Sequence, residues 1–128
     1  MKQTFDSKVF ENLSDRALGL YAAGMDLQNL PENYLEYFQA NSARWDGQHL
    51  EAGLSLLGRL DSDAARHQIA DFLGHPLDYI RLLVIRTLSR MPMDLYIASK
   101  IDERLKSASD KAEIIGLGRL QAMGARES

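Results

Sequence analysis

The feature that most constrains this chain is an internal repeat with a period of 32 residues. Residues 78–91 align with residues 110–123 without a gap, so that Asp78 falls on Asp110 and Leu88 on Leu120. At an offset of 31, residues 49–60 fit the same pattern, and Leu57 falls on Leu88. A period of this length is typical of proteins that stack a repeated helical unit, because one unit cannot bury its apolar side alone.

The spacing of apolar residues within the repeat predicts helices. Ile80, Leu83, Val84, Leu88 and Met91 recur at intervals of three and four, which places them on one side of a helix. No stretch of useful length alternates apolar and polar residues, as a half-buried strand would. The sequence therefore predicts an all-α fold.

Turn and capping residues divide the chain into hairpins. Ser62 offers a capping oxygen before one helix, and Pro76 and Pro92 interrupt the pattern after two others. Gly124 suits a helix C-terminus, and residues 125–128 are expected to form a frayed tail. Because short connections favour antiparallel neighbours, we predict one domain over residues 1–128, with an N-terminal cap at about 1–30 and hairpins at 32–60, 63–90 and 94–123. The paired helices are predicted at 32–40 and 47–60, at 63–74 and 77–90, and at 94–107 and 110–123.

Composition excludes several classes of function. The 128 residues include no cysteine, which rules out disulfides, thiol catalysis and thiolate metal sites. The net charge of −3 disfavours a general nucleic-acid coat. No apolar run approaches the ~20 residues that span a bilayer, and residues 1–10 lack the apolar core of a secretory signal. We therefore expect a cytoplasmic protein with no membrane partner.

The charge is distributed unevenly along the chain. Residues 1–58 hold four Lys or Arg against eight Asp or Glu, whereas the remainder holds eleven against ten. An acidic region of this kind either steers a basic partner toward the protein or is an ordinary solvated surface.

One set of residues recurs in the repeated helix, namely Ile80-Arg81, Val84, Thr87-Leu88-Ser89 and Met91, and in the other copies Gly53, Leu56-Leu57-Gly58, Leu60, Gly116, Leu120 and Met123-Gly124. This pattern resembles the second helix of HEAT-like repeats, in particular the short repeats of phycobilisome-lyase-type proteins. The resemblance covers residues 32–124, and it departs from the family pattern at Arg119, where a small residue is usual.

This resemblance implies a short right-handed α-solenoid of HEAT-like antiparallel helical hairpins with an N-terminal capping helix. It also implies that Arg81 pairs with an aspartate such as Asp78 or Asp110 across neighbouring repeats, which is a structural role. Gly53 and Gly116 occupy one repeated position, and such small residues predict a close approach of neighbouring helices.

The loop at residues 41–46 is the best candidate for a contact surface. It is longer than the corresponding loops and carries the only tryptophan, Trp45, beside Arg44. Insertions in helical repeats often lie on the binding face, and Trp and Arg are favoured interface anchors. With Tyr34, Tyr37 and Glu36 these residues form the predicted partner-binding surface. The alternative is that Trp45 folds back as a lid on the first hairpin.

Other clusters favour structural roles over chemical ones. His67, Asp71 and His75 lie at four-residue steps and would share one side of a continuous helix, as metal ligands can. Gly74 and Pro76 should end that helix, which makes a metal site the weaker interpretation. His49 falls at an inward position and is expected to be a core histidine. Seven arginines could form a basic strip that binds nucleic acid, but acidic residues lie between them in the sequence and make this interpretation the weaker one. They are Arg59, Arg66, Arg81, Arg86, Arg90, Arg104 and Arg119.

Three functions stay open from the sequence. No catalytic, phosphate-binding or cofactor motif is present, so we expect no catalytic residue, metal or cofactor, and favour a non-catalytic adaptor that binds another protein through its helical-repeat surface. A narrower alternative is an immunity or antitoxin protein that neutralises a secreted basic toxin, in keeping with small size and acidity. A nucleic-acid-binding or lyase-like HEAT-repeat protein rests on the resemblance alone. The oligomeric state is left open.

Overall fold

The structure is a computed structural model that describes residues 5–25, 30–60 and 62–127, with side chains up to residue 124. These residues form eight α-helices and two short 3₁₀ helices, and no strand occurs among them. The all-α prediction is confirmed for this part of the chain. The chain divides into two compact units, Met1–Asp61 and Ser62–Ser128, which are described separately.

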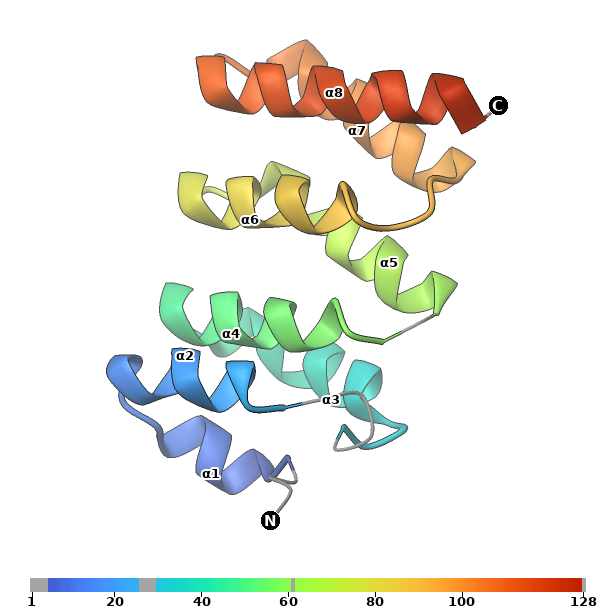
Figure 1. The fold of residues 1–128 in the computed structure, drawn as a ribbon. Coiled ribbons are helices and arrows are strands. Elements are labelled where there is room, and N and C mark those ends of the chain that lie inside the picture. Colours follow the sequence, from blue (N-terminus) through green and yellow to red (C-terminus); the bar gives the residue numbers. More distant parts are fainter. Residues whose placement is uncertain (1–4, 26–29, 61, 128) are drawn as a thin grey trace. The chain divides into compact units, whose positions relative to one another are not determined.

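Each unit contains four α-helices and one 3₁₀ helix among its described residues (Figure 1). Unit 1 is built from α1 (Ser7–Asn12), α2 (Asp15–Ala23), α3 (Tyr34–Asn41), η2 (Ser42–Arg44) and α4 (Gly47–Leu57). Unit 2 is built from α5 (Asp63–Ala70), η3 (Asp71–Gly74), α6 (Asp78–Leu88), α7 (Leu95–Ser107) and α8 (Lys111–Glu127). The predicted hairpin helices are therefore present, with ends that differ by a few residues.

Short polar side chains fix where most of these helices begin. The Asp46 carboxylate accepts a hydrogen bond from the backbone N–H of His49, and the Asp94 carboxylate accepts one from Ile97. Asp6, Ser62 and Asp110 cap α1, α5 and α8 in the same way. Such caps satisfy backbone donors that have no partner within the helix, and each is worth about 1 kcal/mol.

In unit 2, helices one repeat apart lie side by side and run in the same direction. Arg81 near the start of α6 pairs with Glu113 near the start of α8. Met93, beyond the end of α6, lies against Gly124 near the end of α8, because a Cβ built on Gly124 would be 3.2 Å from Met93 Cγ. Helices α5 and α7 also pack on each other, so the two hairpins of unit 2 are layered, with equivalent helices in contact (Figure 1).

Unit 1 has the same arrangement, which gives the N-terminal segment a clearer role than the predicted cap. Helices α2 and α4 pack side by side. Asp15 at the start of α2 lies near Asp46 and His49 at the start of α4, and Arg59 after α4 donates to the Met25 carbonyl after α2. The two helices therefore run parallel, and α1 and α2 form a hairpin layered on the hairpin of α3 and α4 (Figure 1).

Positions predicted from the repeat lie in the cores of the units. Leu57, Leu88 and Leu120 are all buried. The two repeated glycines do admit close neighbours, although side chains rather than helix backbones occupy the space. A Cβ on Gly53 would meet Trp45 Cζ3 at 2.5 Å, and a Cβ on Gly116 would meet Ile85 Cγ2 at 2.8 Å.

The predicted C-terminal boundary is wrong. Helix α8 continues through Gly124 to Glu127 rather than ending at residue 123 with a tail after it. No described glycine has a positive φ, so Gly124 does not adopt the left-handed conformation of a helix-terminating glycine. It serves instead as the place where Met93 lies against α8. Residues 26–29, which fall within the predicted N-terminal cap, lie outside the described residues.

None of the described helices has the length and apolar character needed to cross a bilayer.

Candidate functional site

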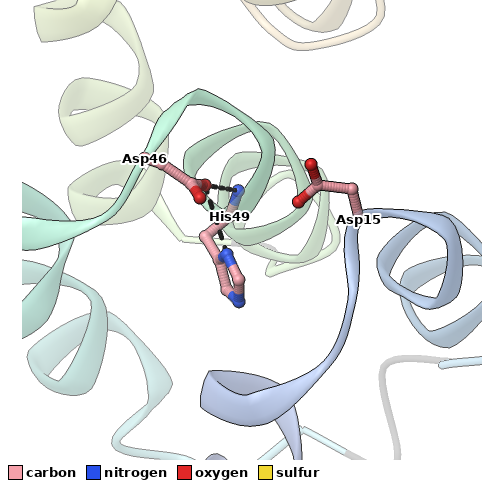
Figure 2. Close-up of side chains that lie close together, drawn as sticks. All are labelled: Asp15, Asp46 and His49. Atoms are coloured by element: carbon pink, nitrogen blue, oxygen red, sulfur yellow. Dashed lines mark hydrogen bonds and ion pairs between the residues drawn. The ribbon is translucent and has the colours of Figure 1, made fainter.

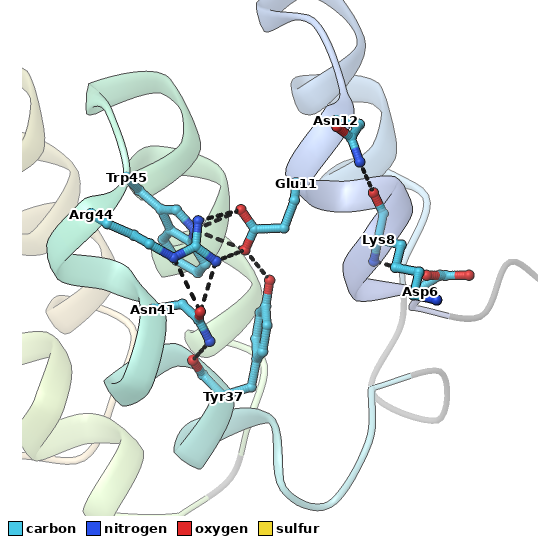
Figure 3. A network of polar contacts seen from close by, with 8 residues as sticks. All are labelled: Asp6, Lys8, Glu11, Asn12, Tyr37, Asn41, Arg44 and Trp45. Atoms are coloured by element: carbon cyan, nitrogen blue, oxygen red, sulfur yellow. Dashed lines mark hydrogen bonds and ion pairs between the residues drawn. The ribbon is translucent and has the colours of Figure 1, made fainter.

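Glu11 is the centre of a polar network that joins α1 to α3 and η2 (Figure 3). Its carboxylate accepts hydrogen bonds from the Tyr37 hydroxyl, from the Trp45 indole N–H at 3.0 Å and from two Arg44 nitrogens at 2.8 and 3.0 Å. Asn41 joins the network by accepting a hydrogen bond from Arg44. The network therefore ties the N-terminal hairpin to the loop that the sequence singled out.

The network keeps Glu11 ionised. Burial opposes the charge of this carboxylate, but hydrogen bonds from Tyr37, Arg44 and Trp45 outweigh burial, so the pKa of Glu11 is lowered. The pKa of Tyr37 is raised by burial and by its hydrogen bond to Glu11, and the phenol therefore remains a donor. Every strong donor around Glu11 is thus used within the protein, which gives the network a structural role.

The five residues predicted to form a contact surface do not share one exposed surface in the structure. Trp45 folds inward against Gly53, Phe10 and Phe38, as the alternative interpretation of this loop predicted. Tyr34 is fully buried and donates to the Gly53 carbonyl, so it forms no part of the surface and its assignment there was wrong. Tyr37 is half-buried. Of the five, Glu36 and Arg44 have exposed side chains, and Arg44 is engaged by Glu11.

A groove of about 270 Å³ runs between the parallel helices α2 and α4. Its existence follows from side-chain size, because Gly19, Ala22 and Ala23 line one wall and Ala52 and Ser55 the other. Leu18 is buried at the floor of the groove, and the wall residues Ala22 and Ala52 are buried as well. The full lining is Asp15, Leu18, Gly19, Ala22, Ala23, Gln48, Glu51, Ala52, Ser55 and Arg59.

The half of the groove that is nearer to the starts of both helices is acidic. Asp15 lies on the α2 wall and Glu51 on the α4 wall. Neither carboxylate has an ion-pair partner within the described residues. Asp46 lies close by, and its lowered pKa has as its main cause the hydrogen bond from the His49 backbone N–H. At the opposite end of the groove, Arg59 donates to the Met25 carbonyl.

Asp15, Asp46 and His49 bring three possible metal-ligand atoms within 4.8 Å of one another (Figure 2). The predicted core histidine is half-buried, and its Nδ1 lies 3.2 Å from Asp46 Oδ1. The remaining ring nitrogen, Nε2, is buried, has no hydrogen-bond partner among the described residues and lies on the side of the ring away from Asp46. Metal-bound histidines usually donate their second ring N–H to an acceptor, so the cluster is better explained as a helix cap.

In unit 2, Glu113 holds two arginines. Its oxygens lie 3.0 Å from Arg81 Nε and 2.5 Å from Arg104 Nε, and its side chain is almost fully buried. Burial opposes ionisation of Glu113, but the two guanidinium groups outweigh it and lower the pKa of this carboxyl. Arg81 also donates to the carbonyls of His75 and Pro76, so it joins the turn before α6 to α8.

The resemblance implied that Arg81 pairs with an aspartate, and this prediction of the partner is wrong. Arg81 does bridge neighbouring repeats, but it binds Glu113, the residue 32 positions later. Asp110 is occupied as the cap of α8, since it accepts from the Glu113 backbone N–H. Asp78 is exposed in the first turn of α6, where a negative charge favours the helix start.

The histidines considered for a metal site have separate partners. His67 Nε2 lies 2.6 Å from Asp94 Oδ2, and its ring stacks on Tyr96. Asp71 accepts a hydrogen bond from the Tyr96 hydroxyl. His75 Nδ1 accepts from the Leu77 backbone N–H. The structure thus separates the three residues, because α5 gives way to a 3₁₀ turn at Asp71.

Several arginines of the proposed strip are occupied within the protein. Arg81 and Arg104 bind Glu113, Arg59 binds a backbone carbonyl, and Arg66 pairs with Asp63. The side chains of Arg86, Arg90 and Arg119 are exposed.

Sequence reasoning missed Glu11, Glu113 and the carboxylates of the groove. A usable signal was present for the groove, because Leu18 and Met25 fall on Leu50 and Leu57 at the 32-residue offset found elsewhere. This alignment would have placed α2 beside α4.

Comparisons of the chain with protein-family models, with characterised proteins and with solved structures gave no match.

Proposed function

We propose that this protein is a non-catalytic interaction module, a short stack of HEAT-like helical hairpins that binds another protein through its α2–α4 surface. The observation that carries the proposal is the open groove between two parallel helices, with a carboxylate on each wall that has no ion-pair partner within the described residues. The layered hairpins within each unit support the proposed stack of helical hairpins, and the proposed solenoid is right-handed, as in HEAT-like repeats.

The properties of the groove favour a macromolecular partner over a small molecule. Its volume of about 270 Å³ is below the ~300–1,000 Å³ typical of small-molecule sites. Its walls also lack the concentration of aromatic side chains that usually lines such sites. A groove of this size suits a side chain that projects from the surface of another protein.

A narrower form of the same function is the masking of a basic toxin. The acidic end of the groove favours this form, since electrostatic complementarity raises association rates. Co-expression with a basic toxin encoded by a neighbouring gene would test it, and unchanged toxicity in the presence of this protein would contradict it.

Site-specific photo-crosslinking in the native host tests the proposed function. A benzophenone amino acid is placed at Ser55 in the groove or, as a control, at Gln39 on the exposed side of α3. We expect Ser55 to give one discrete cross-linked protein and Gln39 to give none. Equal labelling from both positions, or no discrete product from either, would contradict a partner-binding role for this surface.

A further inference from the structure

We infer that the α2–α4 groove receives a lysine or arginine side chain carried by a segment of the partner protein. This inference rests on the proposed function and adds the chemistry of the partner. It depends on three observations. Small residues line the groove, carboxylates lie on both of its walls, and one of these carboxylates, Glu51, has no ion-pair partner among the described residues.

The walls leave room for a long, narrow side chain. Gly19 has no heavy atom within 4 Å of the position a Cβ would take, so the space above it is open. Ala52 faces the groove from the opposite helix, above a floor that includes Leu18. The alkyl part of a lysine or arginine covers apolar surface of this kind while its charged end reaches polar groups.

The polar groups in the half of the groove nearer to the helix starts are acidic on both walls. Asp15 on α2 and Glu51 on α4 would flank a cation from opposite walls, and Asp46 lies beside Asp15. A guanidinium or ammonium group between two carboxylates makes charge-assisted hydrogen bonds. An acidic segment would instead meet like charges, which disfavours it.

Helix starts account for part of this charge, but not for Glu51. Asp46 caps α4, and Asp15 lies in the first turn of α2, where a carboxylate favours the helix. Glu51 lies beyond the first turn of α4, is half-buried, and has no ion-pair partner among the described residues. A half-buried carboxylate without a partner is therefore available to bind a cation from outside the chain.

The test is a selection of random dodecapeptides displayed on phage against the intact protein. We expect the recovered peptides to contain Lys or Arg. Each recovered peptide is then synthesised in two forms, one with arginine and one with citrulline, which has the same shape without the charge. The arginine form is expected to bind about tenfold more tightly, the equivalent of one charge-assisted contact.

The matched variants change the same net charge in different places. The groove variant combines Asp15→Asn with Glu51→Gln, and the control combines Glu32→Gln with Glu103→Gln at exposed positions outside the groove lining. We expect the groove variant to lose about tenfold in affinity for the arginine peptide and the control to change less than twofold. The single variant Glu51→Lys, which leaves the first turn of α2 intact, is expected to abolish binding.

Several results would overturn the inference. Recovered peptides without a basic residue, equal binding of the citrulline form, or full binding by the groove variant would each do so. If Ser55 still cross-links a discrete protein in the host, the proposed function survives such a result and only the assigned chemistry falls. A failure of cross-linking with a retained preference for arginine would instead remove the proposed function.

Discussion

The surfaces over α2–α4 in unit 1 and over α6–α8 in unit 2 are equivalent in the repeat, but their side chains differ in size and charge. At the positions where unit 1 has Gly19 and Glu51, unit 2 has Leu82 and Ile114. Leu82 and Ile114 are 37% and 40% exposed, so large apolar side chains cover the positions that form the groove in unit 1. One packing scheme thus carries an acidic groove in one unit and an apolar surface in the other.

The ion-pair networks around Glu113 in unit 2 and around Glu11 in unit 1 differ in their burial. In unit 2 the carboxylate of Glu113 is buried between two guanidinium groups, whereas in unit 1 Glu11 is 22% exposed and its partner Arg44 is 58% exposed. An ion pair in contact with water contributes little, while a buried one becomes costly when one partner is removed. The stability of unit 2 therefore depends more on its internal ion pairs. In unit 1, the carboxylates without an ion-pair partner among the described residues lie at the surface.

The largest predicted effect comes from Glu113→Gln. It leaves two largely buried guanidinium groups without a counter-charge, and we expect it to lower the free energy of unfolding by about 3 kcal/mol. The matched change, Glu11→Gln, should cost about 1 kcal/mol, because water can solvate Arg44. Urea unfolding followed by far-UV circular dichroism measures both.

Fluorescence sharpens this comparison, since the only tryptophan, Trp45, lies in unit 1 and contacts Glu11. Glu11→Gln should alter the emission of the folded protein, and Glu113→Gln should leave it unchanged. A larger loss of stability in Glu11→Gln than in Glu113→Gln would break the proposed contrast between the units.

The repeated glycines give the next effect. Gly53→Ala places a Cβ against the Trp45 ring, and Gly116→Ala places one against Ile85. We expect each change to reduce stability by about 1–2 kcal/mol, because the neighbouring side chain must move. Thermal unfolding measures this, with Gly118→Ala as the control. Gly118 has no heavy atom within 4 Å of its Cβ position, so alanine there should add about 0.5–1 kcal/mol through helix propensity.

Much of this fold could be predicted from the sequence, and the exceptions share a cause. Apolar periodicity and the internal repeat located the helices from α4 to α8 and the buried positions Leu57, Leu88 and Leu120, since burial repeats with the helix. The partner of Arg81 could not be read in this way, because Asp78, Asp110 and Glu113 are all acidic and only the packing of α6 on α8 selects Glu113. Choosing a long-range partner requires the register between helices, which periodicity along one helix does not contain.

The candidate site was predicted less well than the fold. An aromatic residue in an inserted loop satisfies the composition of an interface and equally that of a local core. The contacts of Trp45 with Phe10 and Glu11 come from α1, whose position beside the loop the sequence did not reveal. Whether the exposed Glu36 contacts a partner stays a prediction.

Acid should destabilise the folded protein through the same two carboxylates. The pKa values of Glu11 and Glu113 are lowered from an ordinary value of 4.5. The unfolded chain therefore takes up protons at higher pH than the folded protein, and stability is lost as the pH falls below about 4.5. Urea midpoints between pH 7 and pH 3 measure the loss, and Glu113→Gln should flatten the profile. A profile that is equally steep in this variant would remove Glu113 as a contributor.

The smallest expected effect on stability comes from exchanging a residue between the two surfaces. Gly19→Leu introduces the residue found at the equivalent position 82, and open space at Gly19 allows it. We expect a gain of about 0.5–1 kcal/mol from helix propensity, together with the loss of arginine-peptide binding, because the groove is filled. Thermal unfolding and a peptide titration measure the two results. Unchanged peptide binding would show that the groove is not the binding surface.

The pairing of Arg81 with Glu113 limits how a chain like this can grow by gene duplication. The two residues occupy the same repeat position on successive helices but carry opposite charges. A tandem copy of the last hairpin would set a second glutamate opposite Glu113, and like charges would meet where an ion pair is needed. A lengthened array would therefore need a neutral or basic residue at this position of the new copy, and Leu18 and Leu50 are neutral residues that hold the same position in unit 1.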